Sequence, residues 1–284
     1  MTILPPRLTI SDYELQSFTL AVKTRYGMDF TNYEPKSLKR GLVRLIAKYQ
    51  LESMVGLWSA MLYNKELIVQ YVDELLVNLT EFFRNAILWQ YLRKELLPSL
   101  IGEKVIKVWH AGCSTGEEAY SMAIILKQLG LLNRADLLAT DLSSKALKVA
   151  QKGVYSHLLW PACQRSFSRY DAQGRVERYF DKGEQSFEVR EPMNSKVQFE
   201  RHNLVQEPIN RQFKLIFCRN VMIYFDQGLK QKVLEQFYQA LEDDGYLIIG
   251  FYDMLPDLAR EMFTLHCPTN RIYTKNLAYQ PTNN

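Results

Sequence analysis

The chain has 284 residues, and its 47% apolar and 23% charged residues are typical of a globular protein with a sizeable core. The net charge of +4 is too small to argue for nucleic acid, and no stretch approaches the ~20 apolar residues of a membrane-spanning helix. The start lacks the apolar core of a signal peptide, and the four cysteines and four histidines are scattered. We therefore expect a cytoplasmic protein without membrane insertion, disulfide framework or metal site.

Residues 9 to about 77 show helical periodicity without strand-like alternation, which predicts an all-helical N-terminal domain over residues 1–77. Ser11 or Asp12 can cap a first helix, and Gly27 begins a turn. A second helix is expected to open at Ser37 and to run through Tyr49.

The second predicted helix has two different faces. Its basic face carries cations at every fourth residue, namely Lys36, Arg40, Arg44 and Lys48. Its apolar face carries Leu38, Leu42, Leu45 and Ile46. The basic face is either an ordinary solvated surface or a docking surface for an acidic partner, and the pattern favours neither.

From about residue 104, apolar runs alternate with helical segments, which predicts an α/β domain with a mostly parallel, doubly wound sheet over residues 78–284. Between about residues 163 and 200 the alternation of helical and apolar segments is lost, and the sequence consists of short polar stretches that contain aromatic residues. We interpret that segment as a small β-rich insertion.

A glycine-containing turn follows the first apolar run, where Gly112 and Gly116 bracket the loop and Glu117 and Glu118 open the next helix. Glycines let a ligand approach the backbone, and helix amides are free at this end. The loop lacks the Lys-Ser/Thr pair of a phosphate-binding loop, and its two acids would repel phosphate. A cationic or zwitterionic ligand fits better, although plain packing is the alternative.

Asp141 ends the second apolar run of this domain. In doubly wound folds an acid at this place commonly receives ribose hydroxyls, so Asp141 is a candidate adenosine ligand. The alternative is a helix N-cap, a role that Ser143 or Ser144 can also fill.

Five motifs in order and register resemble those of the CheR-type chemotaxis receptor methyltransferases, over about residues 10 to 275. They are Asn78-Leu79-Thr80-Glu81-Phe82-Phe83-Arg84, Cys113-Ser114-Thr115-Gly116-Glu117-Glu118, Ala139-Thr140-Asp141, His202-Asn203-Leu204 and Phe217-Cys218-Arg219-Asn220-Val221-Met222-Ile223-Tyr224-Phe225. The resemblance implies a Rossmann-like class I S-adenosylmethionine methyltransferase domain with a small inserted β subdomain, preceded by an all-helical domain. It also implies a cofactor, S-adenosylmethionine, which leaves as S-adenosylhomocysteine.

By the same resemblance, the cofactor-binding residues are Asn78, Thr80, Arg84, Glu118, Asp141, Asn203, Leu204, Arg219 and Asn220, beside the Gly112 turn. The implied reaction transfers a methyl group to glutamate γ-carboxylates of receptors. A carboxylate with a pKa near ~4.3 is already ionised, so no strong base is needed. Arg84 and Tyr224 are the catalytic candidates, although each could instead serve packing or an ion pair.

The implied partners are the methylation helices of a chemotaxis receptor and, in some receptors, a C-terminal tether peptide that adds to the β subdomain. We expect a monomer that binds no nucleic acid. The chain departs from the family at Gly250-Phe251-Tyr252-Asp253, where a Gly-His-Ser-Glu-like stretch is usual. Two alternatives therefore stay open, a methyltransferase acting on another protein or a small acid, and a non-catalytic module that binds S-adenosylmethionine and signals.

Overall fold

The computed structural model describes residues 9–64, 66–68, 70–71 and 80–279. Contacts divide the chain into two compact units, one of residues 1–77 with 224–229 and one of residues 78–223 with 230–284. Residues 224–229 group with the first unit because the Glu34 N–H donates to the Tyr224 carbonyl and Tyr33 forms an isolated bridge with Phe225. The domain boundary expected at residues 77 and 78 lies outside the described residues.

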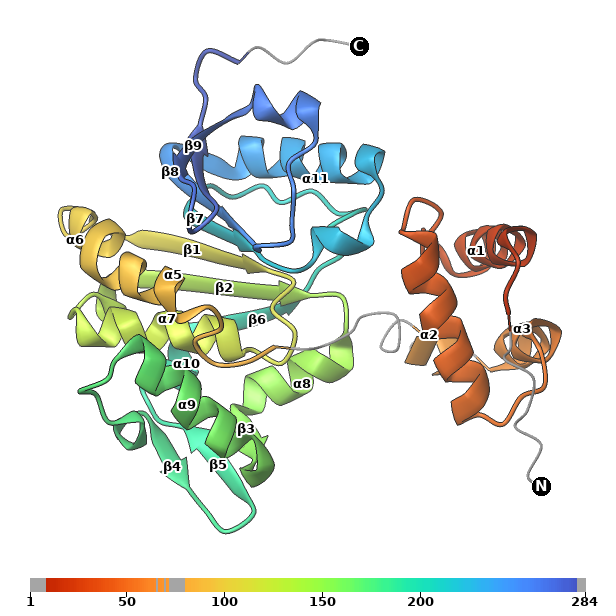
Figure 1. Ribbon diagram of the computed structural model, residues 1–284, viewed down its shortest axis with the longest axis horizontal. Coiled ribbons are helices and arrows are strands. Elements are labelled where there is room, and N and C mark those ends of the chain that lie inside the picture. The colour runs from red at the N-terminus through yellow and green to blue at the C-terminus, as the bar shows by residue number, and fades with distance from the viewer. Residues whose placement is uncertain (1–8, 65, 69, 72–79, 280–284) are drawn as a thin grey trace. The chain divides into compact units, whose positions relative to one another are not determined.

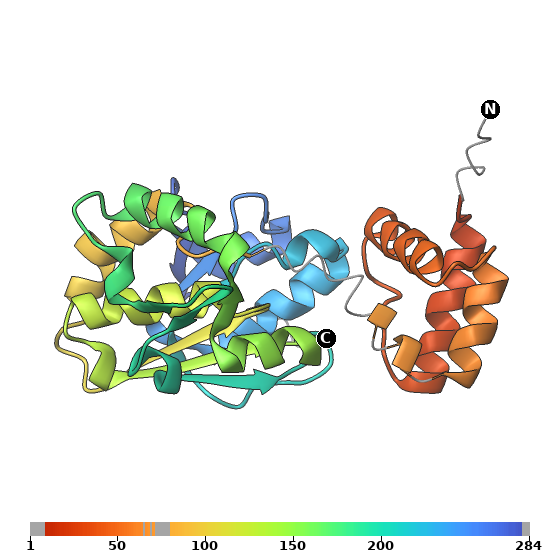
Figure 2. The same ribbon diagram turned by 90° about the horizontal axis from the view of Figure 1, so that it is seen from below.

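The first unit contains α1 (Asp12–Tyr26), α2 (Pro35–Lys48) and α3 (Met54–Tyr63), and α1 lies beside α2 in both views (Figures 1 and 2). Ser11 caps α1 in a capping box with Glu14, and Gly27 ends it at a positive φ of 70°. The described part of this unit holds helices and one isolated bridge, so the predicted all-helical domain is confirmed.

Helix α2 has the two faces that its sequence pattern indicates. The leucines and the isoleucine of the apolar face are buried, namely Leu38, Leu42, Leu45 and Ile46. The four cations are exposed, namely Lys36, Arg40, Arg44 and Lys48. Burial of the apolar stripe therefore orients the helix and leaves the basic face on the surface.

The second unit is built on a seven-stranded sheet of order β6-β2-β1-β7-β8-β10-β9 (Figure 1). Its strands are β1 (Ile106–Ala111), β2 (Ala135–Asp141), β6 (Val197–Arg201), β7 (Phe213–Cys218), β8 (Leu241–Ile249), β9 (Phe263–Cys267) and β10 (Ile272–Lys275). The pairs among β6, β2, β1, β7 and β8 are parallel, whereas β10 pairs antiparallel with both β8 and β9. The predicted mostly parallel, doubly wound sheet is confirmed.

Helices surround this sheet and short 3-10 turns connect them. The helices are α5 (Ala86–Tyr91), the π-helical η1 (Leu92–Leu96), α6 (Leu97–Ser99), α7 (Glu117–Gln128), α8 (Ser144–Lys152), α9 (Trp160–Tyr170), α10 (Met193–Lys196) and α11 (Gln227–Ala240). The 3-10 turns are η2 (Leu132–Arg134), η3 (His157–Leu159), η4 (Val176–Arg178), η5 (Met222–Tyr224) and η6 (Asp257–Arg260).

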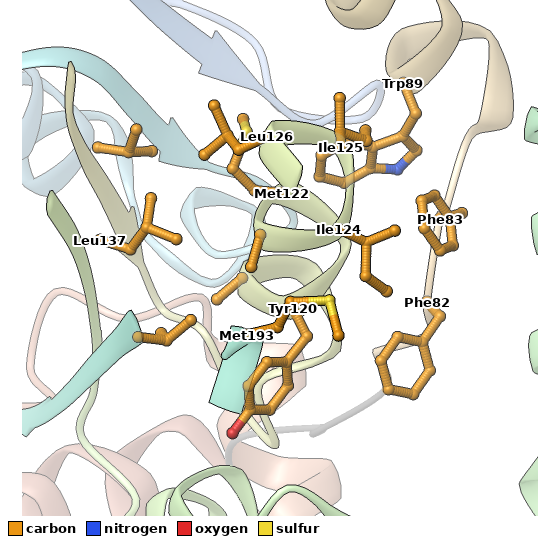
Figure 3. Packing of buried hydrophobic residues seen from close by; sticks show 14 of the residues in the cluster. Phe82, Phe83, Trp89, Tyr120, Met122, Ile124, Ile125, Leu126, Leu137 and Met193 are labelled. Atoms are coloured by element: carbon orange, nitrogen blue, oxygen red, sulfur yellow. The ribbon is translucent and has the colours of Figure 1, made fainter. Parts of the chain in front are cut away.

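Neighbouring side chains of β1 point to opposite faces of the sheet, as strand geometry requires. Trp109 packs against Phe237 of α11, with ring centroids 5.4 Å apart. His110 instead stacks on Phe217 at 4.6 Å, on the side of α7. Figure 3 shows the core beside α7, where buried residues of that helix meet Phe82, Phe83 and Trp89.

A second, three-stranded antiparallel sheet has the order β3-β5-β4, with β3 at Val154–Ser156, β4 at Phe180–Lys182 and β5 at Ser186–Val189. This sheet begins at residue 154 and ends at residue 189, whereas the sequence predicted a β-rich insertion at about 163–200. Residues up to 170 continue α9, because Cys163, Phe167 and Tyr170 recur at helical spacing and are buried. Residues 197–201 form β6 and pair with β2 in the large sheet.

Candidate cofactor and active site

The predicted site residues gather where the parallel strands end. Strand β1 pairs with β2 on one side and with β7 on the other, so the order of the strands reverses beside β1. In open α/β sheets, ligands bind outside the carboxyl ends of the strands at such a reversal. The loops that follow β1, β2 and β7 are therefore the first place to look for a site.

The loop after β1 makes a tight turn that depends on Gly112. Its φ is 80°, and a Cβ at this position would lie 2.4 Å from Cγ2 of Val221. The N–H groups of Gly112 and Cys113 both donate to the Thr140 carbonyl, at 2.8 and 2.9 Å. Gly116 has a φ of 93° at the start of α7. Glycine is thus needed for the backbone conformation at both ends of the loop.

Asp141 joins the loops after β1 and β2. Its Oδ2 accepts the Ser114 N–H at 2.7 Å, and its Oδ1 accepts the Ser143 N–H at 2.9 Å. The N-cap of α8 is Ser143, whose hydroxyl accepts the Ala146 N–H at 3.1 Å. Of the two interpretations of Asp141, the helix cap is therefore wrong, because Ser143 caps α8.

Glu118 is the centre of a buried charged network. Its Oε1 lies 3.0 Å from Nδ1 of His110, and its Oε2 accepts a 2.9 Å hydrogen bond from Arg219. Burial would raise the pKa of the Glu118 carboxyl, but the hydrogen bond with His110 and the Arg219 charge lower it below its ordinary value. Glu118 is therefore an anion at neutral pH.

Arg219 ties this network to the segment before α5. Its second terminal nitrogen donates to the Arg84 carbonyl at 3.2 Å and to Asn85 Oδ1 at 2.6 Å. The guanidinium also lies 6.0 Å from the centroid of the Trp89 ring. The guanidinium is 3% exposed, so its partners rather than solvent fix its position.

Asn220 has a φ of 60° and is supported by the loop that departs from the family pattern. Asp253 Oδ2 accepts the N–H groups of Asn220 and Gly250, at 2.7 and 2.9 Å. Burial raises the pKa of Asp253, although these two hydrogen bonds lower it in part. A Cβ on Gly250 would lie 2.5 Å from Asp253 Oδ2 and 2.7 Å from the Asn220 nitrogen, so the glycine and the acid act together.

Asn203 and Leu204 follow β6 and form a tight turn. The Asn203 side-chain oxygen accepts the Val205 N–H at 3.1 Å, and its amide donates to Gln206 at 2.6 Å. The Asn203 N–H donates to Glu207 at 2.8 Å. Asn203 and Leu204 are both buried, at the same end of the sheet as Asp141, since β6 is parallel to β2.

Arg84 and Asn220 line one pocket of about 310 Å³ together with residues of α9 and of the loop after β8. Thr80 is partly buried just before this segment. Asn78 lies outside the described residues. Tyr224, the second catalytic candidate, groups with the first compact unit and is not among the residues of this cluster.

Sequence reasoning missed the supporting roles of His110 and Asp253. His110 belongs to a strand whose alternation could have placed it under the loop, but its partner Glu118 is on the next helix. Asp253 accepts the hydrogen bond of the Asn220 N–H although the two residues are 33 positions apart in the sequence. Both contacts are tertiary and leave no local pattern in the sequence.

The residues at this site fit S-adenosylmethionine. Asp141 is an acid at the carboxyl end of β2, the place where doubly wound folds commonly bind ribose, and the Glu118 carboxylate suits a cationic ligand. Ser114 Oγ and His110 Nε2 are buried and have no hydrogen-bond partner within the described chain, as expected where a ligand supplies one. Over the same described residues, no cluster of three or more His, Cys, Asp or Glu could hold a metal ion.

Comparison with known proteins agrees with this site. Residues 78–270 match the family model described as CheR methyltransferase, SAM binding domain, and residues 13–76 match CheR methyltransferase, all-alpha domain. Relatives called chemotaxis protein methyltransferase include one from Vibrio anguillarum, 31% identical with 94% of this chain and 98% of the relative covered. Another, from Listeria innocua, is 31% identical with 82% and 87% covered.

The fold and the matches define a Rossmann-like class I S-adenosylmethionine methyltransferase domain joined to an all-helical domain. More particularly, the chain belongs to the CheR methyltransferase family. Among the described residues, no helix is both long and apolar enough to cross a membrane.

Proposed function

We propose that this protein transfers methyl groups from S-adenosylmethionine to glutamate γ-carboxylates of chemotaxis receptors, as a monomer in the cytoplasm. The observation that carries the proposal is that Arg84 and Asn220, both expected at the cofactor, line one pocket. An acceptor in that pocket would lie beside the cofactor. The relatives named chemotaxis protein methyltransferase support the choice of acceptor.

Glutamate is an acceptor that does not require a strong base. S-adenosylmethionine supplies an electrophilic methyl group, which a carboxylate oxygen attacks while the C–S bond breaks and its electron pair stays on sulfur. The acceptor carboxylate is ionised at neutral pH, so no proton has to be removed. The protein has to exclude water and hold the carboxylate in line. We assign that orienting role to Arg84, whose planar guanidinium matches a carboxylate.

For the cofactor we propose that Asp141 receives the ribose hydroxyls and that Glu118 attracts its positive charge. Arg219 holds Glu118 in place, and Asn220, Asn203, Leu204, Thr80, Asn78 and the Gly112 turn complete the site. The position of Asp141 supports its role, because its carboxylate lies at the carboxyl end of β2 and accepts backbone N–H groups from the loops after β1 and β2. Tyr224 remains a proposed hydroxyl contact to the reacting group.

Two surfaces are proposed for receptor contacts. The basic face of α2 would meet the acidic methylation helices of a receptor, because four exposed cations lie along it. A tether peptide would add to an edge of the small sheet, where β3 and β4 are the outer strands.

The test is transfer of radiolabelled methyl from S-adenosylmethionine to membranes that contain chemotaxis receptors. Label released as methanol in base shows ester formation on glutamate. The Arg84→Ala variant should lose turnover more than stability, and Arg84→Lys should restore it only in part because an ammonium lacks the planar fork. Base-stable label, or no label despite cofactor binding, would disprove the proposed acceptor.

A further inference from the structure

The pocket that contains Arg84 has a second side that the cofactor does not explain. Besides Arg84 and Asn220, it is lined by Ser166 and Arg169 of α9, by Phe251 and Tyr252 after β8, and by four residues before or at the start of α5, namely Glu81, Phe83, Asn85 and Ala86. All of these belong to the second compact unit. The pocket thus runs from the carboxyl ends of the strands towards a helix and a loop outside the cofactor motifs.

Arg169 adds a second cationic side chain to the pocket, which thus has Arg84 and Arg169 against one acidic side chain, Glu81. The Arg169 side chain is exposed, and no carboxylate of the described chain lies within ion-pair distance of it. Two other arginines of this unit do have carboxylate partners, since Arg93 pairs with Asp171 at 2.8 Å and Arg219 pairs with Glu118 at 2.9 Å. The Gln90 amide donates to the Arg169 carbonyl at 2.8 Å, which fixes the backbone that carries it.

Exposed apolar side chains follow β8, and two of them, Phe251 and Tyr252, line the pocket. Phe251 is 59% exposed, Tyr252 75% and Met254 62%. The two rings meet edge to face with centroids 5.4 Å apart, and the Arg271 guanidinium lies 5.7 Å from the Phe251 ring. Clustered exposed aromatic and methionine side chains are typical of a surface that a partner covers.

This loop is held in place rather than free to collapse. The Asp253 N–H donates to the Gly250 carbonyl at 3.1 Å, and Asp253 Oδ2 accepts the N–H groups of Gly250 and Asn220. The turn therefore presents Phe251 and Tyr252 beside the pocket from a fixed base.

We propose that this pocket is the acceptor site, in which Arg169 acts beside Arg84 to bind the carboxylate of an acidic side chain, and Phe251 and Tyr252 pack on an apolar residue of the same segment. On a helix, such a residue lies three or four positions away, where side chains share a face. The inference rests on the proposed function and narrows its substrate class to helical segments with an acid and an apolar neighbour one turn apart.

Binding, measured apart from turnover, tests this site. The probes are two helical peptides with a single Glu, one with Leu four positions later and one with Ala there. Each is titrated by calorimetry into the full-length protein saturated with S-adenosylhomocysteine. Wild type should bind the Leu peptide at least tenfold more tightly than the Ala peptide.

The variants separate the two contacts. Arg169→Ala should weaken both peptides about tenfold, which corresponds to about 1.4 kcal/mol, and Arg169→Lys should restore part of that loss. Arg165→Ala, an exposed arginine of the same helix outside the pocket, should change nothing. The double change Phe251→Ala and Tyr252→Ala should lower affinity for the Leu peptide to that for the Ala peptide.

Three results overturn the proposal. The first is absence of peptide binding to wild type, and the second is equal binding by the Arg169→Ala variant. The third is a changed affinity of that variant for S-adenosylhomocysteine itself, which would show that Arg169 contacts the cofactor and not the acceptor. Failure of the methyl-transfer assay with intact peptide binding would instead disprove the proposed function and leave the acceptor site standing.

Discussion

Glu117 and Glu118 are adjacent at the start of α7, yet their carboxyl pKa values move in opposite directions. Burial raises the pKa of Glu117 to about 7, and the hydrogen bond from Thr115 at 2.6 Å offsets only part of that effect. Glu118 is also desolvated, but His110 and Arg219 lower its pKa. The hydrogen bond with His110 and the ion pair with Arg219 therefore separate the pKa of Glu118 from that of its neighbour Glu117.

The first prediction concerns Glu117→Gln. The folded state holds the Glu117 proton more tightly than the unfolded chain, so this residue costs stability as pH rises from about 4.5 to about 7. The variant does not titrate there and should gain up to about 3 kcal/mol over wild type at pH 8, with little gain at pH 4.5. Thermal unfolding across this range measures the difference.

Glu118→Gln is the matched control. Its lowered pKa gives the folded state stability that is present above the ordinary value and is lost as pH falls through the lowered one. The variant should therefore be less stable than wild type at pH 7. Equal pH profiles for the two variants would contradict the opposite shifts.

The second prediction concerns Gly250→Ala. Its Cβ would lie 2.5 Å from Asp253 Oδ2 and 2.7 Å from the Asn220 nitrogen, so the loop has to shift. We expect a loss of about 1–3 kcal/mol of stability, as for other overpacked sites, and weaker cofactor binding. Gly102→Ala is the control, because a Cβ there meets nothing within 4 Å. Unchanged unfolding and calorimetry of Gly250→Ala would refute the close approach.

The third prediction concerns Asp141. Alanine removes the acceptor of the Ser114 and Ser143 N–H groups as well as the proposed ribose contact, so it should reduce both stability and cofactor affinity. Asparagine keeps one acceptor oxygen and should recover part of the stability, but less of the affinity. Calorimetry with S-adenosylhomocysteine and thermal unfolding compare the two variants. Wild-type affinity in both would remove Asp141 from the cofactor site.

The fourth prediction concerns the basic face of α2. Replacing Lys36, Arg40, Arg44 and Lys48 by Gln should weaken receptor binding, with a smaller difference from wild type at high salt because salt screens surface charges. A variant that exchanges Lys and Arg at the same positions keeps the charge and serves as control. If receptor binding is the same for the Gln variant and wild type at every salt concentration, the basic face is an ordinary solvated surface.

Local rules were sufficient to predict much of this fold. Of the two expected caps of the first helix Ser11 is the one used, the turn at Gly27 ends that helix, and the alternation after residue 104 gives the parallel sheet. The start of the second helix, expected at Ser37, lies instead at Pro35, because the Glu34 side chain caps it. The bounds of the small sheet were not predictable for two reasons. The aromatic residues of α9 obscure its helical spacing, and β6 is defined by its pairing with β2. The same holds for His110 and Asp253, whose partners are fixed only by the tertiary fold.

The contacts of Arg219 have a consequence for how the protein matures. Arg84 and Asn85 precede Arg219 by 135 and 134 positions, and Glu118 precedes it by 101. A nascent chain that stops before β7 therefore has the glycine turn and the acids, but not the cation that holds them together. Because long-range contacts of this kind form only when the sheet is nearly complete, cofactor capture would mark the end of folding of this domain. A ribosome-bound fragment without β7 would lack the Arg219 contacts that hold the cofactor site together.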